Sequence, residues 1–476
     1  MIYCKQIQGE CLMKDKVNIL FSSFPDYSGN PKALYEYILK THPDKFNLYW
    51  VIYDEKSKSN LENKKVNFVL YKSEMYEEII SKINIIFDTN GELLPEKREG
   101  QLYINMWHGS SPKKKGYLLP VENFAEQDEE YYKQARRKTD FLLVPSEFSK
   151  LIFSSVFNMN PQRVLPLGYP RDEYLLNSDG LANLQKFTEA DLKKFNKIIF
   201  YLPTFRKGCN RSDSENIFEN NILNIESYNE GELLKFLEKN NFLLVVKKHP
   251  AEINNFNNIN SDYILMLDEE ELKKKDITIY EILNSADLLI ADYSSVYVEF
   301  LMLEKPVLFF HKDINEYTKN RGLILQDTNI WFPGPKVLKF NEFSNEIIKL
   351  LTDSQYYKKE RKDFRNIMFN RDITNISKDI FEYFFDLNNF QVKVKPFISI
   401  EEEQENKIVE LEEQNNEKQK NIDELVNDKN IISKENQELR EELQMIYNSR
   451  SWKFFRIIQR IRKGKKFENN FNLWNI

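Results

Sequence analysis

The chain has 476 residues, 30% of them charged, and a formal net charge of −6. This length predicts two or three domains, and the negative balance argues against an overall nucleic-acid-binding surface. Because Cys4, Cys11 and Cys209 lack metal-ligand spacing, and no signal peptide or apolar run of membrane-spanning length is present, we expect a protein of the reducing cytoplasm.

The first half of the chain alternates between apolar runs of strand length and segments of helical pattern. Asn30-Pro31 is a favourable helix start, with Asn as the N-cap and Pro as the first helical residue, and it predicts a helix over residues 33–41. A further helix is predicted over residues 147–157. Strands are predicted over residues 17–23, 47–53, 67–71, 83–88, 102–106, 141–144 and 164–167. This β/α alternation is typical of a mostly parallel sheet with helices on both faces.

A second β/α series begins near residue 197. Strands are predicted over residues 198–201, 242–246, 288–291 and 306–310, and helices over residues 232–238, 296–303 and 342 to about 385. The polar residues 207–230 predict a loop or a lid. Two α/β halves imply a cleft lined by the carboxyl ends of strands, where open α/β sheets bind ligands.

Residues 287–310 form a strand–turn–helix–strand unit with small hydroxyl residues at the helix start. Ser294 or Ser295 is well placed to cap that helix. A helix N-terminus also presents unpaired N–H groups and a partial positive charge, so it can hold a phosphate. The residues by themselves leave capping and phosphate binding open.

Residues 401–447 are mostly charged or amide-bearing, with a sparse apolar seam that fits a heptad register. The a positions are Ile408, Asn415, Ile422, Lys429, Asn436 and Leu443, and the d positions are Leu411, Lys418, Leu425, Ile432, Leu439 and Ile446. Leu and Ile at d, with Asn at a, favour a parallel coiled coil in register. A single solvated helix fits the same pattern equally well.

The segment that follows, residues 448–466, contains many bases and no acid. Trp452, Phe455 and Ile458 recur at helical spacing. A basic amphipathic helix with an aromatic residue favours an anionic membrane surface, although a helix packed on the chain's own core is the alternative.

The chain has four histidines. We interpret His42 as a surface residue and leave His311 open, whereas His108 and His249 each follow a predicted strand and lie next to lysines. Such histidines are candidate general bases or phosphate ligands. The sequence shows no glycosidase carboxylate pair, metal cluster, Walker-type loop or dinucleotide fingerprint. We therefore expect a site that binds a pyrophosphate and stabilises its departure without a metal or a cofactor.

Several short motifs occur in a defined order along residues 17–385. They are Trp107-His108-Gly109 with KKKG at 113–116, GYPR at 168–171, YLPTFR at 201–206, KKHP at 247–250, Asp287 with ADYSS at 291–295, Lys305-Pro306 with DINEY at 313–317, and Arg321-Gly322 with PGP at 333–335. In these motifs the chain resembles the CDP-glycerol glycerophosphotransferase family, which contains teichoic-acid polymerases and primases.

The resemblance implies a GT-B-like α/β fold in which two Rossmann-like domains face a cleft. We assign residues 1–185 to an acceptor-side domain and residues 190–386 to a domain that binds the CDP donor. A linker (387–400), a coiled coil (401–447) and a basic amphipathic tail (448–476) complete the predicted organisation.

The resemblance also implies the site residues. His108 and His249 are expected to be catalytic. The residues expected to bind substrate are Trp107, Gly109, Lys113, Arg171, Thr204, Arg206, Lys248, Asp292, Ser294, Ser295 and Arg321.

The implied reaction moves glycerol phosphate, or a related polyol phosphate, from CDP-glycerol or CDP-ribitol to a polyprenyl-linked or glycan acceptor and releases CMP. The product would be a teichoic-acid-like or capsular polymer. We expect a peripheral protein on the inner face of the cell membrane, with no nucleic-acid partner, and leave a homodimer through the coiled coil open. The alternatives are a GT-B glycosyltransferase that uses a nucleotide sugar for surface glycan synthesis and a membrane-tethered assembly protein.

Overall fold

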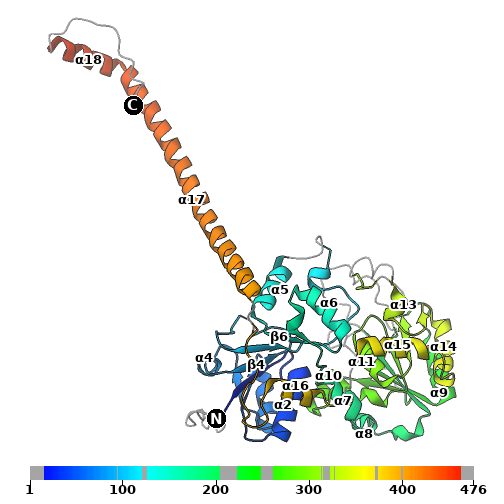
Figure 1. The fold of residues 1–476 in the computed structure, drawn as a ribbon. Coiled ribbons are helices and arrows are strands. Elements are labelled where there is room, and N and C mark those ends of the chain that lie inside the picture. The colour runs from blue at the N-terminus through cyan, green and yellow to red at the C-terminus, as the bar shows by residue number, and fades with distance from the viewer. Residues whose placement is uncertain are drawn as a thin grey trace. The chain divides into compact units, whose positions relative to one another are not determined.

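The computed structural model describes residues 16–93, 95–120, 126–203, 222–223, 225–247, 261–311, 314, 322–325, 327–369, 374–397 and 400–462. The chain divides into two compact units, Met1–Phe397 and Ile398–Ile476. The first unit contains two parallel sheets and the helices that cover them, and the described residues of the second form two helices (Figure 1).

The first sheet has seven strands in the order β3-β2-β1-β4-β5-β6-β7, and every neighbouring pair is parallel. The strands are β1 (Asn18–Ser22), β2 (Asn47–Ile52), β3 (Phe68–Leu70), β4 (Ile85–Asp88), β5 (Leu102–Asn105), β6 (Phe141–Leu143) and β7 (Val164–Leu165). The helices that connect or follow them are α2 (Gly29–Thr41), α3 (Lys58–Asn63), α4 (Glu74–Ile80), α5 (Glu126–Lys138), α6 (Glu147–Phe157), α7 (Asp172–Asn177) and α8 (Gly180–Gln185).

The second sheet has six parallel strands in the order β10-β9-β8-β11-β12-β13. The strands are β8 (Lys197–Leu202), β9 (Phe242–Lys247), β10 (Ile264–Leu267), β11 (Leu288–Ala291), β12 (Val307–Phe310) and β13 (Lys336–Val337). The helices are α9 (Glu230–Asn240), α10 (Glu269–Lys274), α11 (Val296–Phe300), α13 (Thr328–Trp331), α14 (Phe340–Thr352), α15 (Lys358–Met368) and α16 (Ile376–Phe384).

This architecture confirms the predicted α/β fold with two Rossmann-like sheets. Each strand predicted from the sequence is present, and both α6 and β11 have the predicted bounds. The sequence analysis does not predict β10 and β13, which are the edge strands of the second sheet. β13 is only two residues long and shows no apolar run, whereas β10 is the continuous apolar run ILML at 264–267, a strand signal that the sequence analysis did not use.

The start of α2 differs from the prediction. The helix begins at Gly29 with Ser28 at the N-cap position, so the assignment of Asn30 as the N-cap is wrong. Asn30 is instead fully buried in the first turn, and its Nδ2 donates to the carbonyl oxygens of Met106 at 3.0 Å and Trp107 at 2.9 Å. This side chain therefore joins α2 to the loop that follows β5.

Helix α16 follows the second sheet in the sequence but packs on the first. Its Phe381 ring stacks on His42 at the end of α2, with 4.2 Å between ring centroids. The Phe384 ring lies 5.8 Å from both Phe87 on β4 and Phe141 on β6. Figure 1 shows α16 beside α2, so the two α/β halves form one unit through this returning helix.

The second unit contains α17 (Ile400–Asn448) and α18 (Arg450–Arg462). These helices confirm the helical character predicted for both segments. The heptad residues Ile408, Leu425 and Leu443 are 55%, 67% and 62% exposed in the single chain. Among the described helices of both units, none is both long and apolar enough to cross a bilayer.

Replacing Phe384 by alanine should lower the stability of the first unit by about 3–5 kcal/mol, because the ring is fully buried between the sheet and α16 and its loss leaves a cavity. Differential scanning calorimetry measures the loss. The matched control is Leu387→Ala, just beyond the helix, where the side chain is 51% exposed and the expected change is within about 0.5 kcal/mol. Equal shifts in the two variants would contradict the packing role of α16.

Candidate active site

The candidate site is built from two loops at one edge of the first sheet. Strands β4 and β5 are parallel neighbours, with Asp88 opposite Asn105 in the register. Parallel neighbours bring their carboxyl ends to the same edge, so the residues after Asp88 lie beside the residues after Asn105. His108 follows β5 and Asn90 follows β4.

His108 lies on a buried aromatic platform. Trp107 is 4% exposed and packs edge-on against Phe153 and Phe157 of α6, with ring centroids 5.8 and 5.2 Å away. The Trp107 backbone adopts a φ of +50°, which only a few per cent of residues other than glycine adopt. The imidazole of His108 stacks on the Trp107 ring at 4.2 Å and is exposed to solvent. Solvent can therefore reach His108, whereas Trp107 acts as its support.

The surroundings of His108 favour the neutral imidazole. The protein around the ring lowers its pKa below the ordinary value, although solvent still reaches the side chain, and the positive charges of Lys115 and Arg171 lower the pKa further. Its Nδ1 lies 2.7 Å from Oδ1 of Asn90. The ring is therefore unprotonated near pH 7, as a general base must be before it receives a proton from a bound substrate.

Lys115 provides a cation close to this histidine. Its Nζ lies 5.2 Å from the centre of the Trp107 ring. Burial, followed by the charge of Lys113, lowers the pKa of Lys115 to about 8, and Glu299 opposes the shift. The ammonium therefore remains mostly charged at neutral pH and can stabilise negative charge on a group bound at the site.

Arg171 joins the two α/β halves at this loop. It follows β7 of the first sheet, and its Nη2 donates to Oε1 of Glu299 on α11 of the second sheet at 3.0 Å. The Arg171 and Glu299 side chains are only 11% and 1% exposed, and the guanidinium lies 4.6 Å from the centre of the Tyr280 ring. The predicted substrate ligand Arg171 thus has a buried carboxylate partner.

Gly109 is in direct contact with this ion pair. Its φ is +128°, and a Cβ at this position would lie 2.6 Å from Nη2 of Arg171 and 2.7 Å from Oε1 of Glu299. Only glycine allows such a close approach with this backbone conformation. The predicted site residue Gly109 therefore lets the histidine loop pack onto the contact between the halves.

A second contact between the halves involves the lysine segment that follows. Lys113 forms an antiparallel bridge with Leu323. The backbone N–H of Lys114 donates to the carbonyl oxygen of Gly322 at 3.2 Å. The backbone N–H of Ile324 donates to the carbonyl oxygen of Pro112 at 2.9 Å. The second half thus holds the segment of Lys113 by its backbone.

In the second half, the predicted residues Asp292, Ser294 and Ser295 form the turn between β11 and α11. Asp292 is buried, and its Oδ1 accepts the backbone N–H of Ser294 at 2.9 Å. Ser295 occupies the N-cap position, but its backbone is helical and it makes no side-chain cap hydrogen bond. Of the two roles that the sequence leaves open for these serines, Ser295 does not take that of a side-chain cap, and Asp292 holds the turn.

Five predicted site residues lie outside the described part of the chain. They are Thr204, Arg206, Lys248, His249 and Arg321. Most of the predicted lid at 207–230 also lies outside it. The meeting of His108 with His249 in one site therefore remains a prediction.

Sequence reasoning did not single out Asn30, Asn90, Glu92 or Glu299 as site residues. The sequence did offer a signal for Asn90 and Glu92, because both follow a predicted strand and His108 follows the next predicted strand along the chain. Such positions are favoured for ligand-binding groups in parallel sheets. No local signal pointed to Asn30 or Glu299, because each acts through a partner far away in the sequence.

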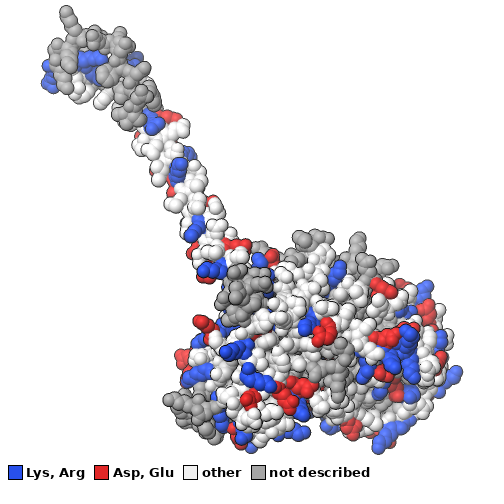
Figure 2. Space-filling view, viewed as in Figure 1, with Lys and Arg blue, Asp and Glu red and all other residues white. Residues whose placement is uncertain are grey.

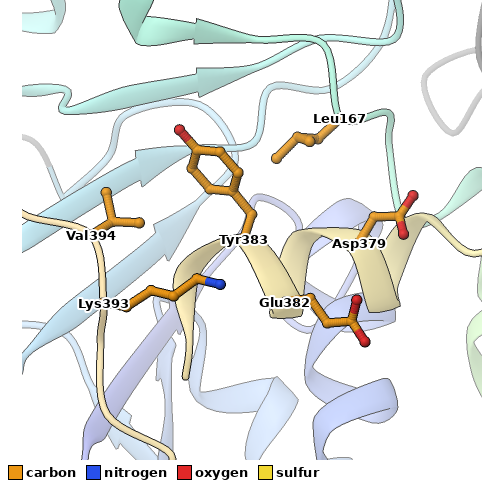
Figure 3. Close-up of a pocket in the computed structure, with 6 residues that line it drawn as sticks. All are labelled: Leu167, Asp379, Glu382, Tyr383, Lys393 and Val394. Carbon is orange, nitrogen blue, oxygen red and sulfur yellow. The ribbon is translucent and has the colours of Figure 1, made fainter. Parts of the chain in front are cut away.

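A separate pocket lies between α16 and the segment that follows β7 (Figure 3). It has a volume of about 640 Å³ and is lined by Leu167, Asp379, Glu382, Tyr383, Lys393 and Val394. None of the predicted site residues lines it. Its two carboxylates would repel a pyrophosphate, so we do not place the donor there.

Replacing Glu299 by alanine should lower the stability of the first unit by up to about 3–5 kcal/mol, because the buried Arg171 guanidinium would lose its carboxylate partner at 3.0 Å and keep only Asp172, whose Oδ1 lies 3.9 Å from Nε of Arg171. The shift in Tm measures the effect. The control is Asp363→Ala, which breaks an ion pair between Asp363 and Lys359. This pair is shorter, at 2.6 Å, but its side chains are exposed, at 84% for Lys359 and 55% for Asp363. The exposed pair should contribute at most about 1 kcal/mol. A loss at Glu299 no greater than at Asp363 would contradict the role assigned to burial.

The comparisons with known proteins agree on one family. The model described as CDP-Glycerol:Poly(glycerophosphate) glycerophosphotransferase matches residues 5–386. The teichoic acid poly(glycerol phosphate) polymerase of Bacillus spizizenii is 28% identical, over 73% of this chain and 86% of that protein. The polymerase of the same name from Staphylococcus epidermidis is also 28% identical, over 72% of this chain, but this chain spans only 47% of its length.

A solved structure supports the same relationship. The wall teichoic acid polymerase TagF matches with a TM-score of 0.64 and 25% identity, over 78% of this chain and 88% of that one. The family match ends just after α16, so α17 and α18 lie beyond it. The chain belongs to the CDP-glycerol:poly(glycerophosphate) glycerophosphotransferase family.

Proposed function

We propose that the protein transfers glycerol phosphate, or a related polyol phosphate, from CDP-glycerol to a membrane-linked acceptor and releases CMP. The observation that carries the proposal is His108: an exposed, neutral imidazole supported by Trp107 beside the cation Lys115. Relatives named as glycerol-phosphate polymerases and primases, and one named as a ribitol-phosphate primase, support this reaction class. The polymer, of teichoic-acid or capsular type, is part of the proposal.

In the proposed step, His108 accepts the proton of the acceptor hydroxyl at Nε2. The acceptor oxygen forms a bond to the β-phosphorus of CDP-glycerol, and the bond from that phosphorus to the bridging oxygen breaks. CMP leaves with the electron pair of the broken bond, and the glycerol phosphate is then joined to the acceptor. Positioning and charge stabilisation supply most of the catalysis in such transfers.

The donor would bind on the side of the second sheet. Ser295 makes no side-chain cap hydrogen bond to α11, so its hydroxyl can contact a phosphate, and Ser294 beside it is proposed for the same role. His249 is proposed as a second catalytic residue that contacts the pyrophosphate. The other residues proposed for the donor are Thr204, Arg206, Lys248 and Arg321. In this proposal the first α/β half binds the acceptor and the second binds CDP.

His108→Ala should reduce CMP release from CDP-glycerol by about 10²–10⁴-fold, because the general base is removed. The dissociation constant of CDP-glycerol, measured by isothermal titration, should remain nearly unchanged. CDP-ribitol and nucleotide sugars are assayed in parallel to identify the donor.

His42→Ala is the matched control, because this histidine packs on α16 at the far end of α2. It should retain wild-type turnover at a temperature well below its Tm. Wild-type turnover in His108→Ala would refute the base assignment. If the protein consumed a nucleotide sugar and released no CMP from CDP-glycerol, the result would instead favour a glycosyltransferase.

We propose that α18 brings the enzyme to its lipid-linked acceptor at the inner membrane surface. Lys453, Arg456 and Arg460 recur at helical spacing along one side, and the described part of α18 carries no acid, whereas α17 carries both signs (Figure 2). The other side exposes Phe454 and Ile461, at 66% and 75%. A helix with these two faces suits an anionic bilayer surface.

Reversing the charges of Lys453, Arg456 and Arg460 to glutamate should weaken flotation with anionic vesicles by at least about 100-fold at low salt. Each base contributes on the order of 1 kcal/mol near such a surface, and high salt screens it. The matched control reverses Lys358, Lys359 and Lys362, which are exposed on α15 and give the same change in net charge. Deletion of residues 449–476 should have the same effect as the α18 reversal, and equal flotation of the full-length and deleted proteins would refute the anchor.

The same unit could also join two copies of the chain. The heptad residues of α17 are exposed in the single chain, and Asn at two a positions favours parallel pairing in register. A homodimer would double the number of α18 anchors and thereby strengthen attachment to the membrane.

A further inference from the structure

The contacts of Asn90 decide which way its amide faces. Its backbone N–H donates to Oε2 of Glu92 at 3.3 Å, and its Nδ2 donates to Oε1 of the same carboxylate at 3.0 Å. Both oxygens of Glu92 thus accept hydrogen bonds from this residue, and the NH₂ group is the half of the amide that can donate, so it is the half that faces Glu92. The carbonyl oxygen Oδ1 of Asn90 must therefore face His108.

This orientation determines the tautomer of His108. Nδ1 lies 2.7 Å from Oδ1 of Asn90, and an amide oxygen can only accept. Nδ1 must then carry the hydrogen, which leaves the lone pair on Nε2. Within the described residues no hydrogen bond is made by Nε2, so this atom is the one presented to a substrate.

The loop that carries Asn90 is held on several sides. Tyr131 on α5 donates its hydroxyl to the carbonyl oxygen of Asn90 at 2.8 Å. Before Asn90, Oδ2 of the fully buried Asp88 accepts the N–H of Leu93 at 3.0 Å and the hydroxyl of Tyr103. Stacking on Trp107 restrains the plane of the imidazole. Stacking on Trp107 thus sets the plane of the imidazole, and the contact with Asn90 opposes its rotation within that plane.

We propose that Asn90, held by Glu92, is a positioning residue that keeps His108 in the Nδ1–H tautomer with Nε2 toward the acceptor hydroxyl. The base role of Nε2 rests on the proposed function, whereas the tautomer does not. A base whose orientation is set by a third group is a recurring arrangement in nucleophilic catalysis. Here the third group is a neutral amide, so it orients the ring without adding a charge next to it.

The tautomer can be measured directly because the chain has only four histidines. In the full-length protein labelled with ¹⁵N-histidine, His108→Gln identifies the His108 signals. We expect a protonated Nδ1 and an unprotonated Nε2 in the wild type. Asn90→Leu should lose this pattern, because no acceptor then faces Nδ1. Asn63→Leu, the same change at an exposed position of α3, should retain it.

Kinetics then separates the two claims. Asn90→Leu should lower kcat by about 10²-fold with little change in donor affinity, because the base is misdirected.

Asn90→Asp is the second variant, and it replaces Asn90→Leu in the test if that variant does not fold. It keeps an acceptor beside Nδ1 and should therefore keep the tautomer. Its added negative charge, opposed by Lys115 and Arg171 and close to Glu92, should raise the pKa of His108. The acidic limb of the kcat/KM profile should then move to higher pH.

A wild-type His108 protonated at Nε2, or an unchanged tautomer in Asn90→Leu, would overturn the inference whatever the activity. Wild-type turnover in His108→Ala, together with the expected tautomer, would instead refute the proposed function and leave the positioning by Asn90 intact.

Discussion

The buried ion pair of Arg171 and Glu299 is the contact on which the arrangement of the candidate site depends. It joins the end of the first α/β half to the helix that follows the DYSS turn of the second. Removing charges from water is costly unless they pair closely, and the buried carboxylate of Asp172 is also present here, with its Oδ1 3.9 Å from Nε of Arg171. Gly109 packs on this pair without a side chain, and the loop that carries His108 therefore has its position set by both halves.

Other contacts act on the same loop from the first half. Asn30 in the first turn of α2 donates to the backbone before His108, and its Oδ1 accepts the N–H of Arg171 at 3.3 Å. One amide thus connects the first helix, the histidine loop and the ion-pair residue. Together with the stack on Trp107, these contacts make the loop a rigid support, as a base with a defined orientation requires.

The functional reading combines two kinds of observation. The family match and the likeness to TagF concern the two α/β halves, whereas α17 and α18 lie beyond the match. The first unit therefore supports the proposal about the transfer reaction, and the second unit supports the proposal about membrane attachment. The distinction is physical: the site depends on buried contacts between the halves, whereas α17 and α18 leave their apolar side chains exposed in the single chain.

The sequence by itself determined the β/α alternation of both halves, the bounds of α6 and β11, and the position of His108 after a strand. These features depend on local periodicity and turn chemistry, which act between residues close in the chain. The hydrogen bond by which Asp292 holds the turn before α11 is local too, because it joins residues two apart, whereas only the tertiary structure decided that Asn30 is buried instead of capping α2. Likewise, the meeting of Asn90 with His108, of Arg171 with Glu299, and of α16 with α2 depends on strand order and packing. No window of neighbouring residues contains that information, because the partners are 18, 128 and more than 300 residues apart.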